Sequence, residues 1–291
     1  MSTLEELLPT QVGSAADTVA HPTDLPNDHQ RYHYFERKYT VERVAGWLLL
    51  IPALPAIGFC WLLVRIGSRG PGFFRQTRVG QGGQEFQVIK LRTMRLDAEA
   101  NGPQWSVKGD PRITRLGRVL RALHLDELPQ LFNVARGEMV LVGPRPERPE
   151  FVELLTREIP GYSRRLIVKP GITGLSQINL PTDSDLRSVE RKQILDLHHI
   201  DHANAWMDFR MVLLTCLRVF FISSERLTKW VGLDRLYLLE DYPVTVTDRR
   251  SVTLQELLAE LQAQKHWQVT AEGEQHDLRL DTAQSKLIRP R

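Results

Sequence analysis

Cysteine is scarce in this chain of 291 residues, which contains only Cys60 and Cys216. Each lies in an apolar run without metal-ligand spacing, so we expect two buried small side chains and neither a redox pair nor a metal site. An excess of one charge is also absent, since 38 Lys and Arg face 35 Asp and Glu for a net charge of +3. That balance gives no indication of nucleic-acid binding. The sequence also lacks internal repeats and low-complexity tracts.

The amino-terminal residues lack the apolar core of a signal peptide and are polar and rich in proline, so we expect a flexible arm there. The carboxy-terminal region is more polar than the middle of the chain. Within it, Thr253 and Glu256 form a capping-box pattern that predicts a helix near 252–264. The sequence therefore divides into three parts, namely an arm (1–36), a membrane-associated domain (37–222) and an appended region (223–291).

Charged side chains are missing from the apolar run over residues 44–64. As a helix it would rise about 30 Å, enough to cross the core of a bilayer. Pro52 and Pro55 lie near its middle and interrupt helical hydrogen bonding. Basic residues flank both ends, which the positive-inside tendency places on the same cytoplasmic side. We therefore predict a re-entrant membrane helix over 44–66 that breaks at Pro52 and Pro55, with a kinked spanning helix as the alternative.

The remainder of the central region predicts a small domain in which helices dominate. Alternating apolar residues predict strands over 85–94 and 139–142. Helical spacing of apolar residues predicts helices over 114–124, 151–159, 188–202 and 206–222. The last of these is strongly apolar, which suits a helix in the membrane interface or, alternatively, a core helix. The expected fold is α+β and mostly helical, with a re-entrant membrane helix and interfacial amphipathic helices around a small cytoplasmic catalytic domain.

Two adjacent acids, Asp126 and Glu127, stand at a predicted helix start, where Pro129 is tolerated in the first turn. Taken alone, such acids suit a helix cap and the helix dipole. The surrounding arginines favour another role, because guanidinium groups bind phosphate oxygens and carboxylates bind divalent cations. These arginines are Arg112, Arg115, Arg118, Arg121, Arg136, Arg145 and Arg148. The pattern indicates phosphoryl transfer, in which charge at the reacting centre must be neutralised.

Several long motifs between residues 38 and 220 resemble the bacterial sugar transferase family, the monotopic polyprenyl-phosphate phosphoglycosyl transferases. They are GPGFFRQTRVGQGG (70–83), IKLRTM (89–94), DPRITRLGRVLR (110–121), LDELPQLFNVARGEMVLVGPRPERPEFV (125–152) and KPGITGLSQIN (169–179). Their length, number and order make this similarity far more specific than a single short pattern.

The resemblance implies transfer of a sugar 1-phosphate from a UDP-sugar to polyprenyl (undecaprenyl) phosphate with release of UMP. This reaction would initiate assembly of an exopolysaccharide or another surface glycan. It implies Asp126 as nucleophile, Glu127 as a catalytic ligand of Mg²⁺, and Lys90, Arg121 and Arg145 as substrate-binding residues. Covalent catalysis of this kind predicts ping-pong kinetics.

The resemblance also implies a place on the cytoplasmic face of the bacterial inner membrane, in contact with membrane lipids. A homodimer and contacts with glycan-assembly enzymes are candidate associations, and no nucleic acid is expected as a partner. Leu54 stands where the family has a serine before Pro55, so the hydrogen bonds that support the helix break must differ here. A membrane-bound nucleotide-sugar hydrolase and a non-catalytic membrane scaffold are the alternative functions, and the sequence does not identify the sugar.

Three further features allow more than one interpretation. Asp208 precedes an apolar stretch and suits either a substrate or second-metal contact or a charge on a helix surface. His198 and His202 stand one helical turn apart, but we expect a solvated face rather than a metal site. Arg75 and Arg78 could steer the UDP-sugar or contact anionic lipid headgroups.

Overall fold

A computed structural model of the chain describes residues 29–100, 102, 104, 109–181, 183, 185–218, 224–240 and 253–263. The helices are α1 (His29–Gly67), α2 (Arg115–Ala122), α3 (Leu131–Arg136), α4 (Pro149–Glu158), α5 (Leu175–Asn179), α6 (Leu186–His202), α7 (Ala205–Leu217) and α8 (Ser224–Trp230). The 3-10 helices are η3 (Gln81–Gly83), η4 (Leu125–Gln130), η5 (Tyr162–Ile167) and η7 (Leu236–Leu239). The strands are β1 (Phe73–Val79), β2 (Glu85–Leu91), β3 (Val140–Val142) and β4 (Gly171–Thr173). Helices dominate, as the sequence predicted.

The strands form two small sheets rather than one. β1 and β2 make an antiparallel hairpin whose register places Phe74 opposite Lys90. β3 and β4 pair in parallel, with Val142 opposite Thr173. The sequence predicted β2 and β3 but not β1, because Arg75 and Arg78 interrupt the alternation of apolar residues that marks a strand.

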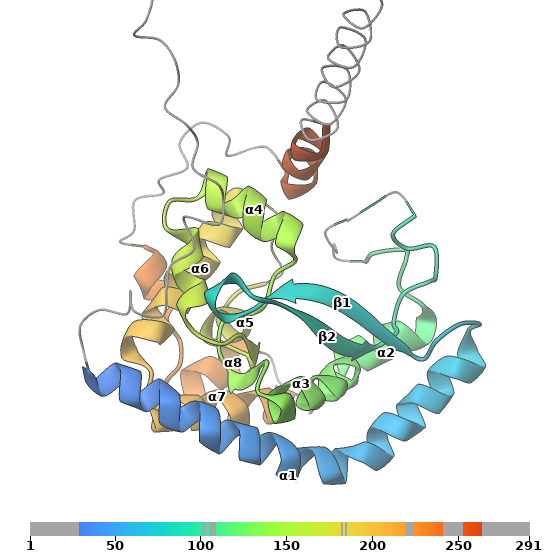
Figure 1. Cartoon of the computed structure of the whole chain (residues 1–291), viewed down its shortest axis with the longest axis horizontal. Helices are drawn as coiled ribbons and strands as arrows, with labels where there is room; N and C mark the ends of the chain where they lie inside the picture. Colours follow the sequence, from blue (N-terminus) through green and yellow to red (C-terminus); the bar gives the residue numbers. More distant parts are fainter. Residues whose placement is uncertain are drawn as a thin grey trace, which may run out of the picture.

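Helix α1 is one continuous helix that bends near its middle and passes along the base of the domain (Figure 1). Pro52 and Pro55 lie inside it, and proline is a common cause of such bends because it removes a helical hydrogen bond. The helix begins at His29, so residues 29–36, which we expected in the arm, are helical here. The rest of the expected arm, residues 1–28, lies outside the described residues.

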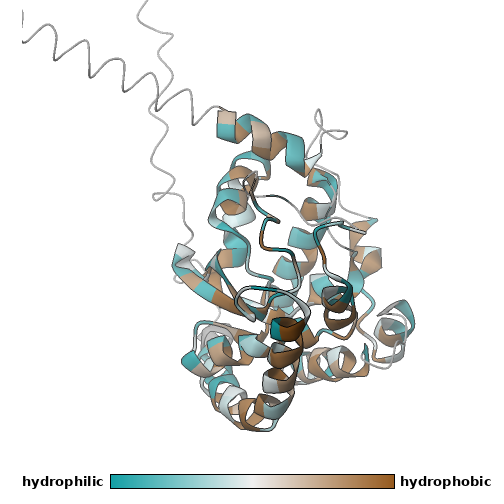
Figure 2. Cartoon of the chain, turned by 90° about the vertical axis from the view of Figure 1, so that its right-hand side faces the viewer, coloured by the Kyte–Doolittle hydropathy of each residue, from teal (hydrophilic) through white to brown (hydrophobic). Residues whose placement is uncertain are grey.

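One face of α1 packs on the domain and the other carries exposed apolar side chains. Leu50 and Ile57 are buried against Leu131 of α3. Close approach is possible because a Cβ on Gly46 would lie only 2.8 Å from Cγ1 of Val134. The exposed apolar residues are Val41, Val44, Trp47, Leu48, Leu49, Ile51, Leu54, Phe59, Leu62 and Ile66. By length and composition α1 could cross a membrane, and apolar residues gather at this base of the molecule (Figure 2).

Both ends of α1 contact the same domain. Near its start, Phe35 is buried with Val168 and Ile200. Near its end, Val64 is buried with Leu91 of β2 and Leu120 of α2. Within the described residues, α1 therefore lies along the domain over its length instead of leading away from it.

Helix α7 covers most of the stretch predicted over 206–222, of which residues 219–222 lie outside the described part of the chain. Met207, Met211 and Leu214 are buried in the core. Trp206 and Phe209 are 64% and 55% exposed. The buried residues fit the core-helix interpretation, and Trp206 and Phe209 remain exposed on α7.

The appended region contributes a helix over residues 254–263. Its start has the predicted reciprocal capping bonds, since the Thr253 amide donates to Glu256 Oε2 at 2.7 Å and the Glu256 amide donates to Thr253 Oγ1 at 3.3 Å. Its leucines are buried beside α4 and α6. This helix, which we call the C-terminal helix, therefore packs on the domain formed by the preceding residues.

Candidate active site

A sharp turn presents Asp126 and Glu127 from the 3-10 helix η4. Helix α2 ends at Ala122, and His124, directly before η4, adopts φ 55° and is the one non-glycine residue with positive φ in the described ranges. That conformation is uncommon for residues other than glycine and occurs preferentially at functional sites. Pro129 lies inside η4, so the short 3-10 segment replaces the regular helix start expected at the acids. The turn places η4 against β2, which carries Lys90.

Glu127 is held between two cations. Its Oε1 accepts hydrogen bonds from Lys90 Nζ at 3.1 Å and from Arg145 Nη2 at 2.9 Å. Burial alone would raise the pKa of Glu127, but the charges and hydrogen bonds of Arg145 and Lys90 outweigh it and lower the pKa well below the usual range. Glu127 is therefore a carboxylate that stays ionised at physiological pH.

The surroundings of Asp126 shift its pKa in the opposite direction from that of Glu127. Its side chain is buried, and burial together with the negative charge of Glu127 raises its pKa above the usual aspartate value. The positive charges of Lys90, Arg121 and Arg145 act against this rise. A carboxylate with little solvation beside several cations suits nucleophilic attack on a phosphate, because the cations attract the substrate and shield its charge.

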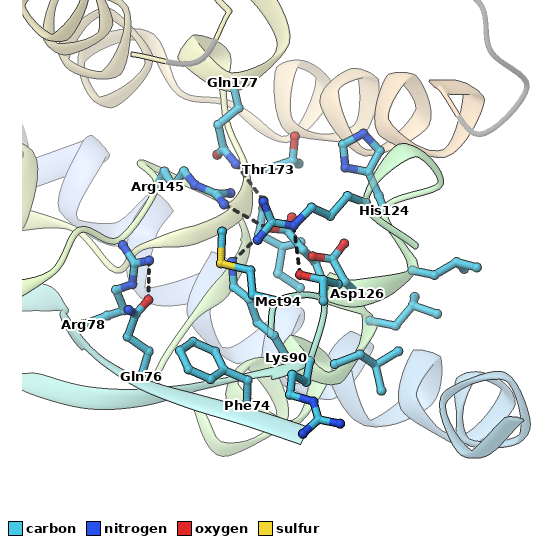
Figure 3. Close-up of a pocket in the computed structure, with 18 of the residues that line it drawn as sticks. Phe74, Gln76, Arg78, Lys90, Met94, His124, Asp126, Arg145, Thr173 and Gln177 are labelled. Carbon is cyan, nitrogen blue, oxygen red and sulfur yellow. Dashed lines mark hydrogen bonds and ion pairs between the residues drawn. The ribbon is translucent and has the colours of Figure 1, made fainter. Parts of the chain in front are cut away.

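Lys90, Arg121 and Arg145 line the same pocket as the two acids, so these five residues meet at one place. Figure 3 labels three of them, Lys90, Asp126 and Arg145. Arg121 reaches this pocket from α2, and its Nε donates to Thr93 Oγ1 at 2.9 Å. The backbone oxygen of Arg145 accepts a hydrogen bond from Arg165 Nη2 at 3.1 Å, which fixes the turn that carries Arg145. The cations are therefore positioned by the protein before any substrate binds.

The pocket has a volume of about 1160 Å³ and extends well beyond the acids. Leu49, Pro52 and Ala53 of α1 line one part of it. Arg148 and Phe151, at the start of α4, line another. Because α1 and α4 lie on opposite sides of the β1–β2 hairpin (Figure 1), the pocket connects the bend of the apolar helix with a charged region.

The sequence did not indicate a second charged network in this pocket. Lys192 Nζ lies 2.5 Å from Glu147 Oε1 and 3.0 Å from Asp183 Oδ2, and Arg78 Nη1 lies 3.5 Å from Glu147 Oε2. Burial raises the pKa of Glu147, but Lys192, Arg78 and Arg165 outweigh it and lower the pKa to about 2. Glu147 and Arg78 belong to motifs that we identified, whereas Lys192 comes from α6 and has no local signal.

Arg75 and Arg78 stand in the same sequence motif, but they lie in different parts of the structure. Arg78 lines the pocket and donates to the backbone oxygen of Pro146 at 3.0 Å. Arg75 is exposed and is not among the residues lining the pocket. Arg78 therefore lies inside the pocket, and Arg75 lies outside it.

Cys216 corrects the expectation of two buried cysteines. Cys60 is buried, but Cys216 is exposed and lines the pocket. It lies on α7, which has one buried and one exposed face, and an apolar run in the sequence does not reveal which face a residue occupies.

Asp208 is neither a surface charge nor part of the pocket lining. It is buried and forms an ion pair with Lys38 of α1. Tyr34 Oη donates to Asp208 Oδ2 at 2.6 Å, and His199 Nε2 lies 2.8 Å from Oδ1. Burial raises the pKa of Asp208, but the His199 hydrogen bond and the Lys38 charge lower it to about 2. Asp208 therefore ties the start of α1 to α6 and α7.

Asp126 and Glu127 are adjacent carboxylates in the pocket, and carboxylate oxygens are suitable ligands for Mg²⁺. Among the described residues no group of three His, Cys, Asp or Glu side chains forms a metal site, and His198 and His202 stack on each other with ring centroids 4.2 Å apart. Mg²⁺ is commonly bound by one or two carboxylates together with substrate phosphates and water. The donor set of the two acids, in a pocket lined by phosphate-binding cations, fits that mode.

Comparison with known proteins gives one consistent family. Residues 33–222 match the family model described as bacterial sugar transferase. The UDP-glucose:undecaprenyl-phosphate glucose-1-phosphate transferase of Caulobacter vibrioides is 37% identical over 225 residues, which cover 73% of this chain and 83% of that protein. The UDP-N-acetylgalactosamine-undecaprenyl-phosphate N-acetylgalactosaminephosphotransferase of Aeromonas hydrophila is 42% identical over 154 residues, 53% of this chain and 36% of that protein. The chain thus spans most of one relative and about a third of the other.

Proposed function

The chain belongs to the bacterial sugar transferase family, and we propose that it transfers a sugar 1-phosphate from a UDP-sugar to polyprenyl phosphate, such as undecaprenyl phosphate, with release of UMP. One observation carries the proposal. A single pocket joins the acids Asp126 and Glu127, the cations Lys90, Arg121 and Arg145, and the bend of the apolar helix α1. A water-soluble anionic donor and a lipid acceptor both require access to such a site.

The reaction proceeds in two displacements at one phosphorus atom. A carboxylate oxygen of Asp126 attacks the β-phosphorus of the UDP-sugar, the bond to the bridging oxygen breaks, and UMP leaves with that oxygen. A phosphate oxygen of the polyprenyl phosphate then attacks the same phosphorus and releases the Asp126 carboxylate. The product is a polyprenyl diphosphate sugar. Dividing the transfer in this way replaces one difficult step with two easier steps.

The cations hold the diphosphate and offset its charge, and Glu127 keeps two of them in place. Lys90 and Arg145 both contact Glu127 Oε1, so their charged groups converge beside Asp126. Asp126 and Glu127 would hold Mg²⁺, which supplies further neutralisation of phosphate charge when bound. Burial of the acids strengthens these electrostatic interactions, because the local dielectric constant is lower than that of water.

We propose a re-entrant placement of α1 in the cytoplasmic face of the bacterial inner membrane. Its exposed apolar residues support membrane association. The contacts of Phe35 and Val64 with one domain support an arrangement in which both ends of α1 lie on one side. Cysteine labelling in intact and permeabilised cells tests this at the exposed positions Glu36 and Arg75, in a chain whose two natural cysteines are replaced by serine. Labelling of the two positions from opposite sides would establish a spanning helix.

The transfer itself is tested with purified full-length protein, Mg²⁺ and a panel of UDP-sugars. We expect UMP release and, without acceptor, a phosphosugar adduct on Asp126 detectable by mass spectrometry. Addition of undecaprenyl phosphate should discharge the adduct, and the Asp126→Asn variant should form none. Release of free sugar phosphate at the same rate with or without the acceptor would indicate a hydrolase. The panel would also identify the sugar, which differs between the two relatives described above.

A further inference from the structure

The C-terminal helix lies beyond the family match, which ends at residue 222. Leu254, Leu257, Leu258 and Leu261 are buried, with Leu258 completely inaccessible. They share one cluster with Phe151, Leu154, Leu155, Ile159, Tyr162, Leu186 and Val189. The C-terminal helix thus completes a core around α4 and α6, and it lies near α4 in Figure 1.

Two elements supported by this core also supply cations to the pocket. Arg148 precedes α4 and Lys192 lies on α6, and both line the pocket. Phe151 links the two regions, because it belongs to the cluster and also lines the pocket. The guanidinium of Arg148 lies 5.4 Å from the centroid of the Phe151 ring. A shift of Phe151 would therefore move the Arg148 guanidinium that packs against its ring.

A second set of contacts leads from the cluster to the acids. Tyr162 Oη accepts a hydrogen bond from Arg165 Nη1 at 2.6 Å. Arg165 also donates to the backbone oxygen of Arg145, whose side chain contacts Glu127. Arg165 is also held by a buried ion pair with Asp196 at 2.6 Å. The support of Arg145 therefore does not depend on the cluster alone, whereas Phe151 and Arg148 adjoin the cluster directly.

The α4 side of the pocket is the place available to the nucleotide. A lipid acceptor enters from the membrane, and the apolar helix α1 lies on the opposite side of the hairpin from α4 (Figure 1). On this side Arg78 and Lys192 pair with Glu147, and Arg148 pairs with Glu99. An ordered set of charged side chains therefore lines the part of the pocket into which the nucleotide extends from Asp126. This step rests on the proposed function.

We propose that the C-terminal helix is a positioning element for donor binding, which holds α4 and α6 so that Arg148, Phe151 and Lys192 keep their places along the nucleotide side of the pocket. It touches no substrate itself. Its loosening should therefore weaken the binding of the nucleotide while the chemical step at Asp126 continues.

The test uses the full-length protein and UDP as the probe, with equilibrium binding measured for the wild type and for Leu258→Ala. We expect the Kd for UDP to rise about fivefold, within the range of couplings transmitted through packed contacts. The KM for the UDP-sugar should rise in parallel, while kcat per active site, counted by the adduct on Asp126, stays within about twofold of the wild type. Leu261→Ala, at the end of the helix, provides a milder variant if the first does not fold. Leu258→Met keeps a large apolar side chain at this position, so this variant should bind UDP with the wild-type Kd.

Leu227→Ala is the matched control, because Leu227 of α8 is 3% exposed and packs in a separate cluster. An unchanged Kd in the folded Leu258→Ala or Leu261→Ala variant would overturn the proposal. An equal rise in Leu227→Ala would also overturn it, since the effect would then be general loosening. Failure of the wild type to bind UDP at all would instead refute the proposed function, and this inference would fall with it.

Discussion

Replacement of Lys90 by methionine probes the charge balance between the two acids. Lys90 Nζ lies 3.1 Å from Glu127 Oε1, and the Lys90 side chain is 19% exposed. At an effective dielectric constant of about 20, unit charges at this separation attract by about 5 kcal/mol, part of which desolvation offsets. Loss of one preorganised donor at developing charge commonly costs about 10²–10³ in kcat. We expect a loss of that size for Lys90→Met.

The same substitution should change the pH dependence of transfer. Asp126 attacks as a carboxylate. Transfer should therefore proceed at pH values above the pKa of Asp126 and slow as the pH falls through that pKa. Burial and the charge of Glu127 raise the pKa of Asp126, and Lys90 heads the groups that lower it. Without Lys90 the pKa rises further, and the acid limb of the pH–rate profile should move to higher pH. Glu127→Gln removes the negative charge that raises the pKa of Asp126, so the acid limb should move to lower pH.

Initial rates of UMP release across the acid range measure both effects. Lys90→Arg keeps a positive charge and should retain the wild-type acid limb. Lys229→Met is the control for loss of a lysine, because Lys229 is exposed on α8, where its Nζ lies 3.0 Å from Glu225 Oε1. An acid limb that stays in place or moves to lower pH in Lys90→Met would refute the electrostatic account of Asp126.

Two further predictions concern the contacts of α1. Replacing Pro52 and Pro55 together by alanine restores backbone donors in the middle of α1, so the helix should straighten and transfer to undecaprenyl phosphate should fall, which an assay of acceptor-dependent UMP release measures. Asp208 has a pKa lowered from 3.8 to about 2, so its ionised form should contribute about 2 kcal/mol of stability above pH 4 that is lost as pH falls through 2. Unfolding of the wild type and Asp208→Asn across this range should show the contribution only in the wild type.

The residues of the site were predictable because each stands in a long motif, but their geometry was not. Lys90 stands in one motif of the sequence (89–94), and Glu127 and Arg145 stand 18 positions apart in another (125–152). Their meeting at one carboxylate oxygen depends on β2, η4 and the turn before α4 being brought together by packing. Spacing along the chain carries no information about such a contact.

The buried ion pair of Lys38 and Asp208 is even harder to predict from the sequence. The two residues are separated by 170 positions, and each stands in a segment that also suits a surface charge. Sequence patterning predicted the capping box at Thr253 and Glu256 because its two residues are three positions apart. Local hydrogen bonds leave a pattern in the sequence, whereas long-range charge pairs leave none.

The bend of α1 and the nucleophile are fixed by the same contacts, which gives the double proline substitution its particular expected effect. Leu131 directly follows η4 and is buried against Leu50 and Ile57, on either side of the prolines, and Leu128 of η4 packs on the same cluster. Straightening α1 would therefore remove part of the support of η4 and change the position of Asp126 relative to α1. The donor reaches the site through water, so adduct formation should be less affected than its discharge by the lipid acceptor. A variant in which both steps slow equally would show that the bend supports the fold of the pocket rather than access of the lipid.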